Sequence, residues 1–197
     1  MATTLDSVLE QARALEAKGD LSGAIGALQQ ASEVMQARGL WRYARGALAL
    51  RQGDLEAALS NLEKAVEAEP EVPEYRSNLG AVWLERARRG EAGASAKALE
   101  VLEAAVRWGP TLPDVFSNYA LALQLAGRNE LALKACDDAL AIDPAHLGAR
   151  FNRAAVLNAM GRHAEAKDAL DAVLSQHPGH PAASAARAKV VERLSRA

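Results

Sequence analysis

The feature that most constrains this chain is a helical pattern interrupted by glycine at regular intervals. Gly19 and Gly53 are 34 residues apart, and Gly127 and Gly161 are separated by the same interval. Each glycine lies between two stretches in which apolar residues recur with helical spacing. Because a fixed period of this length is typical of repeat architectures, the chain is predicted to consist of stacked copies of one small helical unit.

A second pattern follows the turns and places three small or apolar residues on one face of a helix. Residues spaced at i, i+4 and i+7 share a helix face, and small residues there let a neighbouring helix approach closely. The five copies are Ala24-Leu28-Ala31, Ala58-Leu62-Ala65, Ala98-Leu102-Ala105, Ala132-Cys136-Ala139 and Ala166-Leu170-Val173. Proline, which cannot continue a helix, follows four of them, at Pro70, Pro110, Pro144 and Pro178.

These positions resemble the tetratricopeptide repeat family. The third copy matches best, through Leu79-Gly80-x-x-Trp83 followed by Ala98, Leu102 and Pro110. The small residue that the family keeps in its first helix is Ala12, Gly46, Gly80, Ala120 and Ala154 in the successive copies. The resemblance implies an all-α, right-handed superhelix, a solenoid of about five repeats forming a single domain over 1–197.

The predicted repeats cover about 5–38, 39–72, 73–112, 113–146 and 147–180. The remaining segment, 181–195, is predicted to form a capping helix that covers the last repeat, as is common in this family. His180 is placed to cap that helix, and Pro181 suits its first turn. The third repeat carries six additional residues within 86–97, between its two helices.

Composition excludes several classes of function. Half of the residues are apolar and 24% are charged, which is typical of a soluble folded protein. The formal net charge of −2 gives no positive field for nucleic acid. The start of the chain lacks a signal-peptide pattern and no stretch is apolar enough to span a membrane. We therefore expect a cytoplasmic protein, and the frequent alanine and arginine favour a bacterial source.

The sequence offers little catalytic or metal-binding chemistry. His177 and His180 are three residues apart but lack the further ligands that a useful metal site needs. Cys136 is the only cysteine and occupies a core-facing position, which favours a buried structural thiol over a nucleophile. No phosphate-binding glycine loop is present. We therefore predict no enzyme activity, no cofactor and no metal site.

The resemblance implies that the first helix of each repeat lines a concave groove. Counted from the start of each repeat, positions 2, 5, 6, 9, 12 and 13 form the exposed side of that helix, called here the first-helix stripe. Ten residues of this stripe are predicted to bind a peptide: Tyr43, Ser77, Asn78, Ser117, Asn118, Leu121, Gln124, Phe151, Asn152 and Asn158.

Asn78, Asn118 and Asn152 all occupy position 6 of their repeats. An asparagine amide offers both a donor and an acceptor, which matches a peptide backbone unit. The arrangement is similar to the asparagine ladder of the O-linked N-acetylglucosamine transferase superhelices, in that respect only. The alternative is that asparagine is simply one polar residue on a solvated face.

The basic clamp with which some family members hold a C-terminal carboxylate is not expected here. The matching positions hold Glu74, Asp114, Gly148 and Asn152. Since Glu74, Glu85 and Asp114 lie near the groove, the bound peptide is expected to be neutral or basic.

The leading hypothesis is a non-enzymatic adaptor or scaffold that binds an extended segment of a protein partner, without nucleic acid or membrane insertion. The alternative is an assembly component or client chaperone that uses its convex face or the loop 86–97, and that can associate with itself. Arg86, Arg88, Arg89 and Lys97 against Glu91 give that loop a local charge of +3. An extra helical turn with a solvated loop explains the same residues without a binding role.

Overall fold

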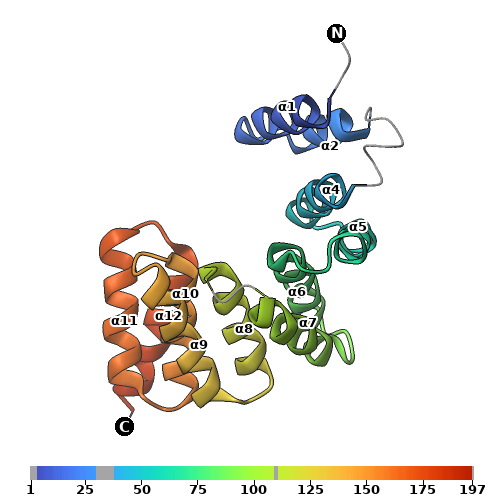
Figure 1. Cartoon of the computed structure of the whole chain (residues 1–197). Coiled ribbons are helices and arrows are strands. Elements are labelled where there is room, and N and C mark those ends of the chain that lie inside the picture. The colour runs from blue at the N-terminus through green and yellow to red at the C-terminus, as the bar shows by residue number, and fades with distance from the viewer. Residues whose placement is uncertain (1–3, 30–37, 109–110, 197) are drawn as a thin grey trace. The chain divides into compact units, whose positions relative to one another are not determined.

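The structure, a computed structural model, describes residues 4–29, 38–108 and 111–196, and its regular elements within these ranges are all α-helices (Figure 1). The chain divides into two compact units, Met1–Ala94 and Ser95–Ala197. The first contains α1 (Leu5–Ala17), α2 (Leu21–Gln29), α4 (Gly39–Gln52), α5 (Leu55–Ala68) and α6 (Pro73–Arg88). The second contains α7 (Ala94–Trp108), α8 (Pro113–Leu125), α9 (Asn129–Ile142), α10 (Leu147–Ala159), α11 (His163–Gln176) and α12 (Pro181–Leu194).

Consecutive helices pack against one another in pairs within each unit. In the first unit, α1 packs on α2 and α4 on α5, and α4 also contacts α1 and α6. In the second unit, α8 packs on α9 and α10 on α11, while α10 lies beside both α8 and α12. The order of pairs is that of a tetratricopeptide-type helical solenoid, which confirms the predicted fold class, and the limits of the individual repeats stay a prediction.

The predicted contact face of each second helix forms the core. Of its fifteen residues, Ala31 lies outside the described residues, and the other fourteen are at most 2% exposed. The alanines at the first position, Ala24, Ala58, Ala98, Ala132 and Ala166, are fully buried. Because these side chains are fully enclosed by their neighbours, a larger residue would have to displace packed atoms, which agrees with a small residue at this position in every copy.

The turn at Gly53 shows why glycine recurs between the paired helices. Gly53 ends α4 in the left-handed conformation, at φ 79°, and its N–H donates to the carbonyl groups of Ala49 and Leu50. A side chain is strained there, so glycine is favoured. Asp54 then caps α5 by accepting the N–H of Ala57 at 3.0 Å. The other turn glycines, Gly19, Gly127 and Gly161, share the left-handed φ.

Proline and histidine set the remaining helix boundaries as predicted. α5, α9 and α11 each end two residues before Pro70, Pro144 and Pro178, whereas Pro110 lies outside the described residues. α12 begins at Pro181, and Nδ1 of His180 caps it by accepting the N–H of Ala183 at 3.1 Å. No helix in the described ranges is long and apolar enough to cross a lipid bilayer.

The close contact between α4 and α5 can be tested at Gly46. A Cβ at this position would lie 2.5 Å from Cγ of Leu62 and 3.3 Å from the carbonyl oxygen of Ala58. We expect Gly46→Ala to lower the free energy of unfolding by about 1–3 kcal/mol, because overpacking outweighs the gain in helix propensity. Urea denaturation followed by circular dichroism measures the change.

Gly26→Ala is the matched control, because nothing lies within 4 Å of a Cβ at this position inside α2. It should raise the free energy of unfolding by up to about 1 kcal/mol. Equal effects of the two substitutions would contradict the close approach of α4 and α5.

Candidate functional site

In the first unit a pocket opens on the first-helix stripe of α1 and α4. Its volume is about 160 Å³, and its lining comes from these two helices alone: Leu9, Ala12, Arg13, Glu16, Leu40, Tyr43, Ala44, Ala47, Leu48 and Arg51. The floor is apolar, and the charged groups stand at its edge. Arg51 forms an ion pair with Glu16 across the two helices, so part of the charge at this pocket is already balanced.

Tyr43, one of the predicted binding residues, joins this pocket to the next first helix. Its ring stacks on that of Tyr75 in α6, with 4.9 Å between the ring centroids. The hydroxyl group of Tyr75 donates to Oε2 of Glu69 at 3.3 Å. Burial, and then the neighbouring Glu69 carboxylate, raise the pKa of Tyr75. Tyr43 thus lines the pocket on one side and stacks on Tyr75 on the other.

In the second unit a larger pocket, of about 540 Å³, lies between α10 and α12. Gln124 of α8 and Leu170 of α11 complete its lining, whose other members are Ala154, Ala155, Asn158, Ala159, Ala182, Ala185, Ala186, Lys189, Val190 and Arg193. It contains Gln124 and Asn158, two of the predicted binding residues. Half of the lining residues are alanine, so the helix backbones are close to the pocket surface there.

The contribution of α12 to this pocket is a functional feature that sequence reasoning missed. Pro181 follows Leu147 by 34 residues, so α12 begins in the register of a first helix. Counted from Pro181, five of the six stripe positions of α12 belong to the pocket lining, namely Ala182, Ala185, Ala186, Lys189 and Arg193, and the sixth, Glu192 at position 12, does not. The capping helix thus both covers α11 and extends the first-helix stripe. The 34-residue register was the signal that could have revealed it.

A small hydrogen-bond network fixes the polar end of this pocket. Oδ1 of Asn158 accepts a hydrogen bond from Nη1 of Arg193 at 3.0 Å and lies 3.1 Å from Nδ1 of His163. Since arginine can only donate, the amide oxygen must face Arg193, and Nδ1 of His163 then carries the proton. The Asn158 amide therefore has its acceptor occupied and its N–H groups left as donors.

Asn152 is engaged within the structure. Its Nδ2 donates to the backbone oxygen of Ser117 at 3.0 Å and to the Ser117 hydroxyl oxygen at 3.1 Å, which ties α10 to α8. The donor half of the Asn152 amide is thus used between helices, and Oδ1 is the half left for a ligand. Asn152 was predicted to pair with a peptide through both a donor and an acceptor. In the structure only its acceptor, Oδ1, is left for a peptide.

The other predicted residues divide between buried and half-buried positions. Ser77 and Ser117 are buried, at 3% and 5% exposure, so the binding surface proposed below does not include them. Phe151 is half-buried, with its ring centroid 5.4 Å from that of His180. The half-buried stripe residues also include Asn78 in the first unit and Asn118 and Leu121 in the second.

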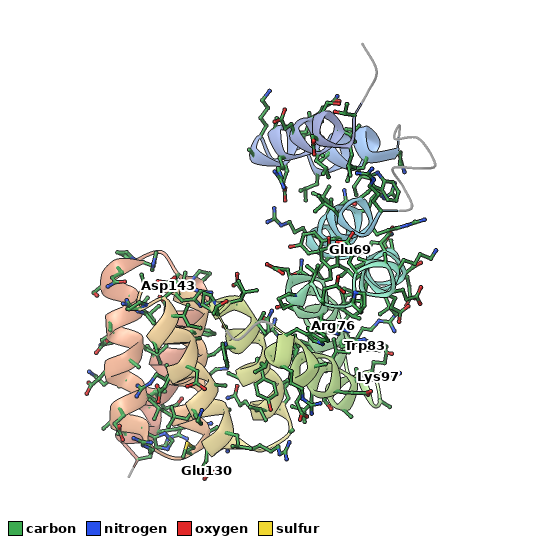
Figure 2. All side chains as sticks on the ribbon, in the orientation of Figure 1. Glu69, Arg76, Trp83, Lys97, Glu130 and Asp143 are labelled. Carbon is green, nitrogen blue, oxygen red and sulfur yellow. The ribbon has the colours of Figure 1, made fainter. Side chains whose placement is uncertain are left out.

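The segment 86–97, which begins in the last turn of α6, exposes less unpaired positive charge than its sequence predicts. Arg86 is buried, its Nη1 donates to Oε1 of Glu91 at 3.1 Å, and its Nη2 pairs with Glu56. Its guanidinium also lies 5.0 Å from the ring centroid of Trp83, which Figure 2 labels on α6. Arg86 therefore holds the loop in place and cannot be part of an exposed basic patch.

The two arginines that follow are paired as well. Arg88 and Arg89 lie 3.6 Å and 3.4 Å from the carboxylate of Glu85. α6 has 16 residues, against 13 for α8 and for α10, and Gly90 and Gly93 then turn the chain with positive φ. The geometry agrees with the simpler interpretation, an extra helical turn followed by a short loop.

Cys136, His146 and His180 have structural roles. Cys136 is fully buried, and burial raises the pKa of its thiol to about 12, so it stays protonated. His146 and His180 each use Nδ1 to cap a helix, α10 and α12 respectively. Among the described residues, no three histidine, cysteine or acidic side chains gather as a metal site.

Comparison with protein-family models identifies the family. Models described as tetratricopeptide repeat match residues 9–60, 43–113 and 123–190. Most of the chain is covered, so the chain belongs to the tetratricopeptide repeat family. A comparison with curated protein sequences gave no match.

Solved structures of the same fold include two bacterial proteins. TTC0263, a tetratricopeptide repeat protein of Thermus thermophilus, is 22% identical with a TM-score of 0.80, covering 95% of this chain and 99% of its own. MamA of Desulfovibrio magneticus RS-1, residues 41 to the end, is 18% identical with a TM-score of 0.69, covering 92% and 99%. At these identities the likeness concerns the fold alone.

The bond between Asn152 and Ser117 predicts a specific cost for an isosteric substitution. Asn152→Asp replaces a donor by a carboxylate oxygen that faces the Ser117 carbonyl oxygen. We expect the free energy of unfolding to fall by about 1–3 kcal/mol at neutral pH. The deficit should narrow as the pH falls from neutral toward about 4, because facing the carbonyl oxygen raises the pKa of the new carboxyl group in the folded state and its protonation restores a donor. Urea titrations at several pH values measure it.

Asn129→Asp adds the same charge to the same unit at the first residue of α9, where an acidic group interacts favourably with the helix dipole. It should change stability by less than about 0.5 kcal/mol. If the two variants unfold alike, the tie between α8 and α10 contributes nothing.

Burial of Cys136 predicts an unreactive thiol. With a pKa of about 12, almost none of the thiol is ionised at pH 8, and the thiolate is the reactive form. We expect no reaction of the folded chain with a chromogenic disulfide reagent over an hour, and release of one equivalent after unfolding in urea. Rapid labelling of the folded protein would contradict this packing.

Proposed function

We propose that the chain is a non-enzymatic adaptor that binds extended peptide segments of partner proteins along the first-helix stripes of its two units. The observation that carries this proposal is that each unit has a pocket on that stripe. The pocket at α1 and α4 and the pocket at α10 and α12 use equivalent helix positions. A repeated, partly apolar hollow on the same helix face suits a peptide that extends along the stripe.

The lining chemistry also supports peptide binding over small-molecule chemistry. The walls are alanine and leucine with a few amides and charged groups at the edge. Such surfaces supply apolar contact for side chains and hydrogen bonds for a backbone. Each hydrogen bond contributes only about 0.5–1.5 kcal/mol, so apolar contacts must provide much of the affinity.

The asparagine ladder is part of this proposal, although Asn152 contributes only its acceptor to it. Asn78 and Asn118 stand at stripe positions of the first and the second unit respectively, and Oδ1 of Asn152 is the free half of its amide. The same residues would hold the backbone of a peptide in each unit. YrrB, a family member of the same fold, is described as having an unusual peptide-binding site; it is 21% identical with a TM-score of 0.64, covering 93% of this chain and 92% of its own.

The loop 86–97 is a weaker candidate for the binding surface. The cations Arg86, Arg88 and Arg89 are all paired with carboxylates of the first unit. Binding of an anionic partner there would have to compete with these existing ion pairs.

The proposal is tested by filling the two pockets. Peptides are first selected on the intact chain from a display library of random 12-residue sequences. Affinities of synthetic copies are then measured for Ala47→Arg and Ala155→Arg, whose parent residues line the two pockets. We expect at least one of these substitutions to weaken each peptide by about tenfold or more, because the long side chain occupies the space that the peptide needs.

Ala68→Arg and Ala172→Arg are the matched controls, because both alanines are exposed on second helices. They should leave affinity unchanged. Asn78→Ala and Asn118→Ala test the ladder, with an expected loss of about threefold to tenfold each. Selected peptides that ignore both pocket substitutions, or an unsuccessful selection, would count against the proposed function.

A further inference from the structure

The pocket between α10 and α12 carries positive charge without a matching negative charge. Lys189 and Arg193 belong to its lining, which otherwise consists of alanine, leucine, valine and two amides and contains no carboxylate. Neither cation forms an ion pair with another described residue. Both side chains are exposed and stand one helical turn apart on α12 beside the pocket walls, and two neighbouring cations attract anionic groups.

The hydrogen-bonding groups of the pocket point to the same kind of ligand. Oδ1 of Asn158 is occupied by Arg193, which leaves the N–H groups of that amide as donors. Arg193 uses one N–H in this bond, and its planar guanidinium keeps further donors that can hold both oxygens of a carboxylate. Lys189 offers only donors as well. A site dominated by donors selects a ligand rich in acceptor oxygens.

The alanine walls allow an extended chain to bring such a group into reach. The short side chains of Ala155, Ala182, Ala185 and Ala186 leave the pocket open along the groove between the helices. We propose that this pocket binds a segment of a partner protein through aspartate or glutamate side chains held by Lys189 and Arg193. This inference rests on the proposed function, because it names the kind of peptide that the stripe of the second unit takes.

The two acidic residues of this stripe, Asp114 and Glu192, do not oppose the inference. Asp114 lies 2.9 Å from Nε2 of His146, whose Nδ1 accepts the N–H of Ala149. Nε2 therefore carries the proton and donates to Asp114. Position 2, where Asp114 stands, and position 13, where Arg193 stands, are separated along a helix by about 16 Å. Within α12, Glu192 pairs with Arg196 and is absent from the pocket lining.

The inference is distinct from the basic clamp that is absent here. That clamp uses early positions of consecutive first helices, which here hold Asp114, Gly148 and Asn152. Lys189 and Arg193 stand late in α12, at positions 9 and 13, and have side-chain carboxylates as their expected ligands. The sequence-based expectation of a neutral or basic peptide is thereby revised for the second unit.

The test uses the intact chain and the same display library, whose 12-residue peptides are fused at their C-termini and so carry only side-chain carboxylates. Wild-type protein is compared with the double variant Lys189→Glu, Arg193→Glu. Among the peptides selected on the wild-type protein, those whose affinity falls with Ala155→Arg bind in the pocket. We expect this group to be enriched in aspartate and glutamate. The double variant should enrich lysine and arginine instead.

Synthetic, C-terminally amidated copies of the enriched acidic peptides then give dissociation constants. We expect about 30-fold weaker binding to the double variant, or when the peptide glutamates become glutamine, and weaker binding as salt rises to about 0.15 M. Lys189→Arg, which keeps the charge, should retain binding. Arg107→Glu, Lys134→Glu is the charge-matched control, because both cations are exposed on second helices of the same unit.

The outcomes separate the two claims. If peptides bind in the pocket by the Ala155→Arg criterion without acidic enrichment, or without loss in the double variant, the inference is wrong and the proposed function stands. If acidic peptides bind but only the free C-terminal acid form is recognised, the assignment to side chains is wrong. If no peptide responds to the pocket substitutions, both claims fail.

Discussion

The close approach of each helix pair is the constraint on which the rest of the structure depends. Fully buried alanines such as Ala58 and Ala132, followed one turn later by Leu62 and Cys136, let the first helix lie against the second with little space between backbones. This contact sets the orientation of each first helix and therefore the position of the pockets on it. The side of the first helix that faces the second is fixed, and so the opposite side becomes the first-helix stripe.

This constraint explains how much of the fold could be predicted from sequence. The i, i+4, i+7 pattern and the turn glycines are local signals repeated in several copies, and repetition removes the ambiguity that a single copy carries. Helix ends followed proline, and the cap at His180 followed from a polar residue before Pro181. These are short-range effects of backbone chemistry, so they can be read without knowing what lies across space.

The site was less predictable, because it depends on which partners the polar groups find. Asn152 was recognised at the right position, but its bond to Ser117 occupies half of its amide. Arg86 counted as an exposed charge in the sequence and is buried between two carboxylates and Trp83. In each case the sequence supplies the group, and only the packing of neighbouring helices decides whether it is used internally or left for a ligand.

Charged residues of the first-helix stripe also divide into those paired within the protein and those left for a ligand. The stripe acids Glu85 and Asp114 suggested a preference for basic peptides, yet each is close to a donor of its own unit, Arg89 and His146 respectively. Lys189 and Arg193 were not predicted as binding residues, because α12 was assigned from the sequence only the role of covering the last repeat. α12 has one face against α11 and another that continues the stripe, so cations on the stripe side can gather without disturbing the packing between helices.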